Sequence, residues 1–385
     1  MKRIWAIALV LMLLGGSAAA DGMRVYVAKE AMDVQTASRL IRLLGGAFPQ
    51  ETWTLEHEAQ RGESLSALVM ADRAPQMAIC SPSEAVLWAK EGLLVPLTHS
   101  VQDQKSIAPA VLQVCTQDEA LFMAPLTARQ HGMAANRRLM EKQHLGYMLN
   151  PLEHPAWLTT QLYQVLEEFL IADQPAMEIW PAQPDTCEAL AALVQTLYGG
   201  CFFSEDGMPE MEDIASLSAG MAWLSGMTEH EMINMAEDKE AALARFVAGE
   251  TAIFMDWTSQ LQAKYAKALE ENGVEVAALP YPSSSGDVVR VFELTGASVF
   301  DSGDEKRNDL ALKAVAFMHE DVQVQLLLGD RAILHDDAQW LPALGMREQG
   351  ATVRALLCDT LQSVMEGEEP DAALGLMQAA MQALH

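Results

Sequence analysis

A short apolar strand runs directly into a helix start within the first hundred residues of the chain. Residues 76–80 are of strand length, and residues 81–84, Ser-Pro-Ser-Glu, form a capping box with proline at the first helical position. Upstream, the strand-like segment MRVYVA (23–28) is followed by a helix that Asp33 can cap, and an alternating strand covers residues 52–58. Strands and helices that alternate at this spacing predict the α/β class with a largely parallel sheet.

The rest of the chain is richer in helical patterns. TAIFM, residues 251–255, has the pattern of a buried strand followed by Asp256 and Trp257, and Gly249 ends the helix before it. VEVAALP, residues 274–280, is a further predicted strand. We see no internal repeat and no low-complexity segment. The predicted helices cover residues 155–170, 186–197, 238–248 and 309–328, and a pair of helices covers residues 352–385.

The chain is strongly acidic, with 53 Asp and Glu residues against 25 Lys and Arg residues and a formal charge of −28. A surface this negative repels phosphate backbones, so nucleic acid is not expected as a partner. The 385 residues, 50% of them hydrophobic, suffice for two domains with their own cores. Five cysteines are too few for a disulfide scaffold. Pairing of Cys187 with Cys201 stays open, because the predicted helix between them separates the two thiols.

The first twenty residues have the pattern of an export signal. Two basic residues precede an apolar run over residues 4–14, and Ala18 and Ala20 stand where a signal peptidase cuts. We expect cleavage after Ala20, so that the mature chain starts at Asp21 and keeps 23 basic residues against 53 acidic ones. No cysteine near this point predicts a lipid anchor, and no later apolar run approaches the ~20 residues of a membrane span. The sequence therefore predicts a soluble periplasmic protein.

Seven segments, which together follow the motif order of one protein family, match the motifs of that family. AALARFVAGETAIFMDWTS (241–259) is similar to a Phe-x-x-Gly-x-Ala-Ala-Met motif followed by Trp. Residues 73–97 are similar to a Pro-Asp-Val strand, a helix and a Gly-Leu-x-Pro-Leu turn, with Gln76 where the motif usually has Asp. Residues 124–145 resemble the segment that leaves a first lobe, and HPAWLTTQL (154–162) resembles a Pro-x-Thr-Trp motif.

The C-terminal half continues the match. LTGASVF (294–300) resembles a Gly-rich crossover, residues 311–344 resemble an Ala-x-x-Phe helix with a late proline, and residues 364–384 resemble a terminal helix pair. On these segments the chain resembles the extracellular solute-binding proteins of bacterial ABC importers, family 1, in the branch of maltose-type and other carbohydrate binders with the periplasmic binding protein type II fold. The resemblance covers essentially the whole mature chain.

The resemblance implies two α/β lobes joined by hinge-crossing strands, with a small-molecule ligand between them. Lobe 1 would hold residues 21–125 and 294–330, and lobe 2 would hold residues 126–293 and the C-terminal helices in residues 331–385. The lobes would close on the ligand, and ABC permease subunits in the inner membrane would receive the closed form. We expect a monomer that needs no cofactor and no metal. The ligand itself stays open between a sugar, a polyamine and other small solutes.

An enzymatic function finds little support in the sequence. His230 and Glu231 start like the zinc motif His-Glu-x-x-His, but Asn234 replaces the second histidine, so we interpret the segment as a polar helix surface. The chain lacks Gly-x-Ser-x-Gly, Gly-x-Gly-x-x-Gly and phosphate-loop motifs. Two alternatives to an importer subunit remain: a secreted two-domain α/β hydrolase, and a ligand-sensing receptor for a membrane kinase.

The candidate ligand-binding residues follow predicted strand ends, where α/β sheets bind ligands. Trp257 follows the strand 251–255 and can stack on a sugar face, while Asp256 can accept hydrogen bonds from hydroxyl groups. Ser81 begins a helix whose free amide groups can meet a hydroxyl or carboxylate. The alternatives are a Trp257 ring that anchors the next helix to the core and a serine that only caps its helix.

Five further candidates come from the predicted crossovers and from two tryptophans. Arg129 and Gln130 follow the first crossover, and Glu293 lies at the second, so hinge packing is the alternative role. Trp180 ends another predicted strand before two prolines, and Trp340 precedes Pro342 in the C-terminal segment. Each of these tryptophans is as compatible with a core position as with a ligand contact.

Overall fold

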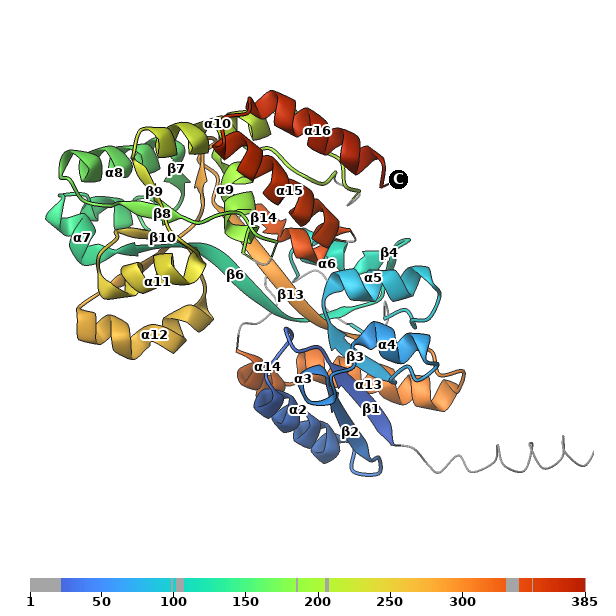
Figure 1. The fold of residues 1–385 in the computed structure, drawn as a ribbon. Helices are drawn as coiled ribbons and strands as arrows, with labels where there is room; N and C mark the ends of the chain where they lie inside the picture. The colour runs from blue at the N-terminus through green and yellow to red at the C-terminus, as the bar shows by residue number, and fades with distance from the viewer. Residues whose placement is uncertain are drawn as a thin grey trace, which may run out of the picture.

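The computed structural model describes residues 22–97, 100–101, 107–184, 186–204, 208–329, 339–347 and 349–384. The predicted signal peptide lies outside these residues. The described chain forms two α/β lobes, as predicted, and long strands run from one lobe into the other (Figure 1). The strands are β1 (Met23–Val27), β2 (Trp53–His57), β3 (Met77–Cys80), β4 (Thr116–Gln117), β5 (Ala120–Leu121), β6 (Ala124–Asn136), β7 (Trp157–Leu158), β8 (Met177–Ile179), β9 (Ile233–Met235), β10 (Ile253–Trp257), β11 (Val276–Leu279), β12 (Pro282–Ser283), β13 (Val289–Val299) and β14 (Gln339–Pro342).

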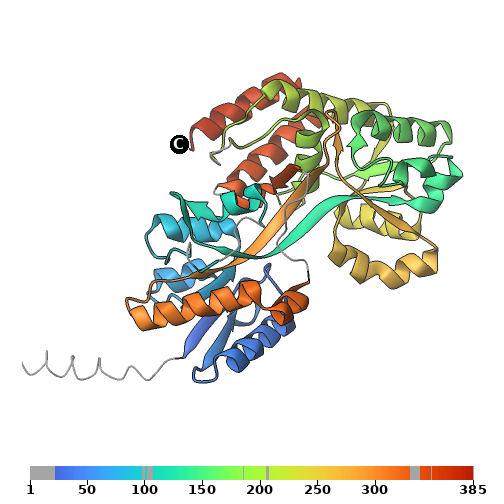
Figure 2. The ribbon, with the colours of Figure 1, turned by 180° about the vertical axis from the view of Figure 1, so that it is seen from behind.

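Helices cover the strands in both lobes (Figures 1 and 2). They are α2 (Val34–Ala47), α3 (Glu58–Arg61), α4 (Leu65–Met70), α5 (Pro82–Lys90), α6 (Pro109–Val114), α7 (Arg137–Lys142), α8 (Thr159–Ile171), α9 (Glu188–Tyr198), α10 (Ile214–Glu229), α11 (Lys239–Ala248), α12 (Ser259–Asn272), α13 (Glu305–Glu320), α14 (Val322–Leu328), α15 (Gly350–Met365) and α16 (Pro370–Gln382), with short 3₁₀ helices η2 (Gly146–Leu149) and η3 (Leu344–Met346).

One ten-stranded sheet connects the lobes. Its order is β2-β1-β3-β13-β6-β10-β8-β9, with β11 also paired to β6 and β14 to β13. The strands β1, β2 and β3 are parallel, whereas the 13-residue β6 and the 11-residue β13 pair antiparallel along the hinge. Both hinge strands are visible running from one lobe into the other (Figures 1 and 2).

Each lobe has its own hydrophobic core. The core of lobe 1 gathers side chains from residues 23–128 and 292–324 together with Trp340. The core of lobe 2 gathers side chains from residues 133–291 and 343–381. A separate core on each side of the hinge lets the lobes move as bodies while β6 and β13 bend.

Local sequence signals set several element ends as predicted. Asp33 caps α2 by accepting hydrogen bonds from the N–H groups of Gln35 and Thr36 at 2.8 and 3.0 Å. Ser81 and Glu84 form the predicted capping box at the start of α5. Gly249 ends α11 in the left-handed conformation, with φ of 79°, which glycine adopts without a steric cost.

Two predictions about helices are wrong. Residues 309–328 form two helices rather than one, because Asp321 ends α13 and its side chain then caps α14. The segment around His230 is a turn and not a helix surface. It follows the end of α10, and Glu231 takes a positive φ of 56° before β9 begins.

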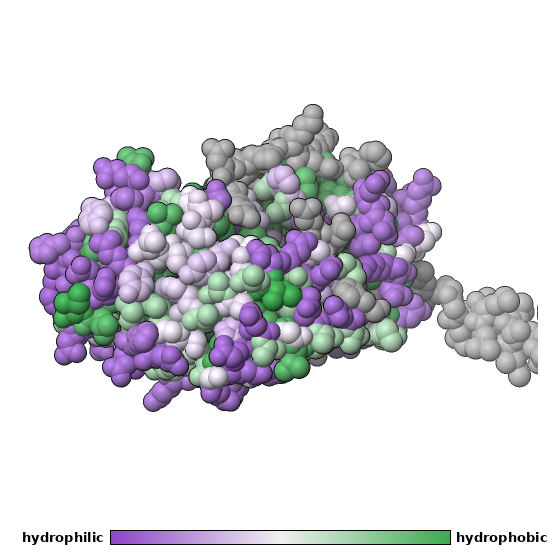
Figure 3. All heavy atoms as spheres, turned by 90° about the horizontal axis from the view of Figure 1, so that it is seen from above, coloured by the Kyte–Doolittle hydropathy of each residue, from purple (hydrophilic) through white to green (hydrophobic). Residues whose placement is uncertain are grey.

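The surface and the cysteines add two observations. Cys187 and Cys201 lie at opposite ends of α9, whose 11 residues span about 16 Å, so this pairing is excluded. Seen from above, apolar side chains lie in small groups among polar ones on the face in view (Figure 3). Among the described residues, no helix is both long enough and apolar enough to cross a membrane.

Candidate functional site

A cleft with a volume of about 1030 Å³ lies between the two lobes. Lobe 1 contributes the loop between β1 and α2, helix α3 and the start of α5. The hinge strands β6 and β13 form its floor, and η3 with the start of α15 contributes the facing wall. The carboxyl ends of the parallel strands β1, β2 and β3 therefore open into the cleft, which is where α/β sheets bind ligands.

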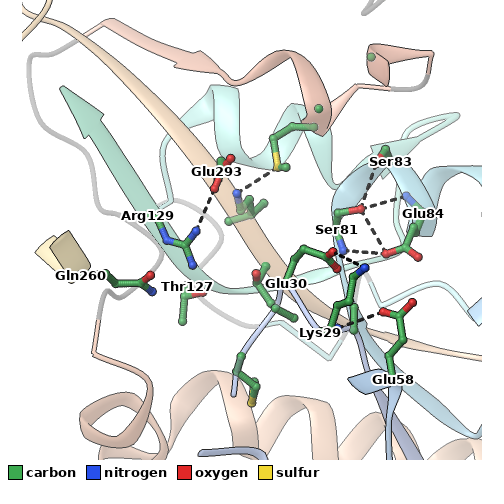
Figure 4. Close-up of a pocket in the computed structure, with 18 of the residues that line it drawn as sticks. Lys29, Glu30, Glu58, Ser81, Ser83, Glu84, Thr127, Arg129, Gln260 and Glu293 are labelled. Carbon is green, nitrogen blue, oxygen red and sulfur yellow. Dashed lines mark hydrogen bonds and ion pairs between the residues drawn. The ribbon is translucent and has the colours of Figure 1, made fainter. Parts of the chain in front are cut away.

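Carboxylates dominate the lobe 1 wall (Figure 4). Glu30 lies 3.3 Å from the ammonium group of Lys29, whose backbone N–H donates to Glu58 at 3.1 Å. Hydrogen bonds from Thr36 lower the pKa of Asp33, so this carboxylate stays charged. Burial raises the pKa of Glu84, the acidic member of the capping box. This wall supplies acceptors for hydroxyl or ammonium groups.

Arg129 and Glu293 face each other on the floor of the cleft. They are paired residues of β6 and β13, and Nη1 of Arg129 lies 3.1 Å from Oε2 of Glu293 (Figure 4). Both side chains are about 30% exposed, so they are open to a ligand. Because side chains alternate along a strand, Thr127 and Arg129 of β6 both line the cleft, whereas Gln130 points to the opposite face.

A chain of buried charges supports this floor from lobe 2. His131 lies 2.9 Å from Asp256 and 3.3 Å from Glu293, and Lys239 forms an ion pair with the same Asp256. Burial alone would lower the pKa of His131, but its hydrogen bond to Asp256 and its ion pair with Glu293 raise that pKa to about 10. Burial likewise works against the charge of Asp256, and the partners His131 and Lys239 lower its pKa to about 2. His131 is therefore a cation at neutral pH.

Two arginines dominate the lobe 2 wall. Arg354 of α15 lies 3.3 Å from Glu188, whose carboxylate also accepts backbone N–H groups of Leu344 and Gly345 at 3.0 and 3.1 Å. Arg347 donates to the side chain of Gln113 at 3.3 Å. The cleft thus has an acidic wall in lobe 1 and a basic wall in lobe 2.

The structure brings together three of the predicted ligand residues. Ser81, Arg129 and Glu293 all line the cleft. Asp256 does not line the cleft; it is buried between His131 and Lys239, and His131 connects it to Glu293 on the cleft floor.

The three predicted tryptophans lie in hydrophobic cores. Trp257 packs edge-on against Phe246 and Phe254 in lobe 2, with ring centroids 5.5 and 6.3 Å away. Trp180 stacks on Phe254 at 5.6 Å and lines a separate apolar pocket of about 250 Å³. Trp340 packs against Phe292 in lobe 1. For each of them the structure shows the core role, and none lines the cleft.

The sequence reasoning missed most of the charged lining. Lys29 and Glu30 directly follow the predicted first strand, so the strand-end rule could have found them. Arg347 and Arg354 carried no local signal, because only the return of the C-terminal segment to β13 brings them to the cleft. No Trp, Tyr or Phe is among the described residues that line the cleft, and this part of the chain holds no cluster of three metal-ligating side chains.

Comparisons with known proteins agree with this architecture. The family described as bacterial extracellular solute-binding protein matches residues 53–332. The fold is similar to a cyclic alpha-maltosyl-1,6-maltose binding protein from Arthrobacter globiformis (TM-score 0.72, 16% identity, 94% of this chain and 98% of that one). It is also similar to the GacH receptor of Streptomyces glaucescens, solved unliganded and in complex with acarbose (TM-score 0.70, 14% identity, 94% of this chain and 98% of that one). A third similar structure is an ABC substrate-binding protein of Listeria monocytogenes in complex with cycloalternan (TM-score 0.69, 12% identity, 94% of this chain and 98% of that one). No curated protein matches the sequence.

Proposed function

Because the chain belongs to the bacterial extracellular solute-binding proteins, we propose that it is the exported binding subunit of an ABC importer and delivers a small carbohydrate. The observation that carries this proposal is the polar cleft between two separately cored lobes. A ligand that contacts both walls stabilises the closed arrangement over the open one, and the permease can then distinguish loaded from empty protein.

The chemistry of the cleft suits a hydroxyl-rich solute. Carboxylates such as Glu30 and Glu293 accept hydrogen bonds from sugar hydroxyls, while Arg129 and Ser81 donate to their oxygens. Two of the structural relatives named above were solved in complex with cycloalternan and with acarbose, and the third is a cyclic alpha-maltosyl-1,6-maltose binding protein, which supports a carbohydrate ligand. From these relatives we infer only the class of ligand, a carbohydrate, for this protein. Which sugar it binds is a question for the experiment below.

A thermal-shift and calorimetry screen tests the proposal. The mature protein is mixed with neutral and acidic mono- and oligosaccharides, amino acids and polyamines, and ligands at ~100 times their dissociation constant should add roughly 2.7 kcal/mol of stability. The bound sugar should be recovered unchanged, which separates a binding protein from a hydrolase. Binding of no carbohydrate, or conversion of the sugar during incubation, would overturn the proposal.

Loss of uptake distinguishes an importer subunit from a kinase receptor. Deletion of the protein should abolish accumulation of the identified radiolabelled sugar in whole cells. If accumulation persists and only the transcriptional response to the sugar disappears, the receptor alternative is correct.

A further inference from the structure

The basic wall of the cleft holds an arginine, Arg347, to which the described residues supply no counter-ion. Of the described residues, no carboxylate forms an ion pair with Arg347; its hydrogen bond goes to the amide oxygen of Gln113. Its Nε is buried and has no hydrogen-bond partner. Burial lowers the pKa of Arg347, yet a guanidinium stays charged. A desolvated cation without an anion is costly, so this position favours an anionic partner.

A second arginine that lines the same cleft is already held in place. Glu188 binds one side of Arg354 at 3.3 Å, while Nε of Arg354 is buried without a hydrogen-bond partner. Glu188 is itself fixed by the two backbone N–H groups of η3, so it holds Arg354 in position. Arg354 thus keeps donor capacity for a group in the cleft.

The helix that carries Arg354 adds to the positive potential of this wall. Helix α15 begins at the cleft without a side-chain cap and without an acidic residue in its first turn. By contrast, the lobe 1 helices that start at the cleft are neutralised by their own side chains, α2 by Asp33 and α5 by Glu84. The positive end of the α15 dipole is therefore left for another anion.

We propose that the solute is an acidic carbohydrate whose carboxylate binds between Arg347 and Arg354 at the start of α15. This inference rests on the proposed function and narrows its ligand class. The hydroxyl groups of the sugar then face the carboxylates of lobe 1, such as Glu30. The formal charge of −28 repels an anion at long range, but at physiological ionic strength salt largely screens charges that are more than about 8 Å apart. The direct contact between the carboxylate and the arginines is screened much less.

Matched sugar pairs test the proposal. Each neutral sugar is compared by calorimetry with its uronic acid, for example glucose with glucuronate and a neutral galactose oligomer with the corresponding galacturonate oligomer. We expect at least one acid to bind about tenfold or more tightly than its neutral partner, because charge-assisted hydrogen bonds form with the acid alone. Its affinity should fall as salt rises from 20 to about 300 mM.

Two variants and one control assign the preference to the arginine wall. Arg347→Gln should remove most of the acid-over-neutral preference, and Arg347→Lys should restore part of it because the charge returns. Arg73→Gln is the control. It removes a charge from an ion pair with Glu63 on the lobe 1 surface, outside the cleft lining, and should leave the acid-over-neutral preference unchanged.

The outcomes separate this inference from the proposed function. Equal binding of neutral and acidic sugars, or an acid preference that survives in Arg347→Gln, overturns the acidic-ligand inference and leaves the carbohydrate function standing. Equal binding of free sulfate or acetate identifies a simple anion site and also overturns it. Binding of no sugar in any pair overturns both.

A different observation concerns two cysteines of lobe 2. Cys187, at the start of α9, has its thiol 4.0 Å from the carbonyl oxygen of Arg354, the residue one turn before Cys358 in α15. Both thiols are buried, and within α15 the carbonyl group of Arg354 pairs with the backbone N–H of Cys358, so the Cys187 thiol lies next to the backbone of Cys358. Cys187 and Cys358 therefore lie next to each other between α9 and α15, although they are 171 residues apart in the sequence.

We infer that Cys187 and Cys358 form a disulfide in the exported protein. The two thiols lose two electrons and two protons, and a disulfide-bearing exchange partner of the cell envelope accepts them and leaves as two thiols. Because both sulfurs are buried, the exchange takes place before the lobe has finished folding. The bond ties α15, and with it Arg354, to α9 next to Glu188.

Thiol counting tests the disulfide. Protein exported to a bacterial periplasm, then denatured and alkylated, should show three free thiols of its five, and five after reduction. Peptide mapping should link Cys187 with Cys358. Reductant should lower the melting temperature of the parent and leave Cys187→Ala unaffected. Five free thiols in the exported protein, or a bond to another cysteine, would overturn the inference.

Discussion

Trp257 shows how a single residue can satisfy a sequence rule and still serve another role. The ring follows a predicted strand end, yet β10 continues through Trp257, and a shift in its pairing with β6 lies between Phe254 and Trp257. That irregularity lets both rings, three residues apart, contact each other at 6.3 Å. The alternation of TAIFM contains no trace of it, so the sequence could not place this ring.

Removal of the ring should therefore damage the fold first. We expect Trp257→Ala to lose about 3–5 kcal/mol of unfolding free energy, because the ring is 5% exposed and packs against Phe246 and Phe254. Trp257→Phe, which keeps an aromatic ring, should lose much less. Urea unfolding followed by circular dichroism measures both. A stable Trp257→Ala variant with weakened sugar affinity would instead establish the original ligand-contact prediction.

His131 makes the stability of the hinge floor depend on pH. Its pKa in the folded protein is raised to about 10, so its contribution to stability is fully present below the unfolded value of about 6.5 and is lost as pH rises through 10. Between pH 6.5 and 10 the parent should lose more unfolding free energy than His131→Gln, as measured by chemical denaturation. Asp256, with a pKa near 2, does not titrate in this window. Parallel pH profiles would show that the ring is neutral in the fold.

At the scale of elements, the sequence was informative where side chains act locally. The capping box of α5, the Asp33 cap and the Gly249 end depend on residues within one turn of each other, so a short window contains the whole signal. The break at Asp321 was missed because apolar spacing continues across it from α13 to α14.

The candidate site was only partly predictable for a related reason. Ser81, Arg129 and Glu293 follow strand or crossover signals, so they were found. Arg347 and Arg354 reach the cleft only because β14 pairs with β13, a contact between segments about 50 residues apart that no local pattern encodes. Gln130 is not among the described residues that line the cleft, as expected because neighbouring side chains of a strand point to opposite faces.

The start of α5 combines a structural and a binding role that a matched pair of variants can separate. Ser81→Ala and Ser64→Ala each remove an N-cap hydroxyl, from α5 and α4, and each should cost about 1 kcal/mol of stability. Only Ser81 lines the cleft. We therefore expect weaker sugar binding by calorimetry in Ser81→Ala and unchanged binding in Ser64→Ala. Equal affinities in both variants would reduce Ser81 to a helix cap.

At the scale of the whole molecule, two cores on one pair of strands predict motion between rigid bodies. A ligand that contacts both walls of the cleft should shift the protein toward a closed form, because only closure lets lobe 1 carboxylates and lobe 2 arginines reach the same molecule.

Spin labels at exposed sites can follow this motion: Met70 in lobe 1 is 83% exposed, and Leu152 in lobe 2 is 92% exposed. With Cys201 replaced by Ser, labels at these two positions should change their separation when a sugar proven to bind is added. Labels at Leu152 and Leu376, both in lobe 2, should keep theirs. If the first pair also stays unchanged, the ligand binds a cleft that is already in its final shape, and a permease would have to detect loading by contact with the ligand rather than by the relative position of the lobes.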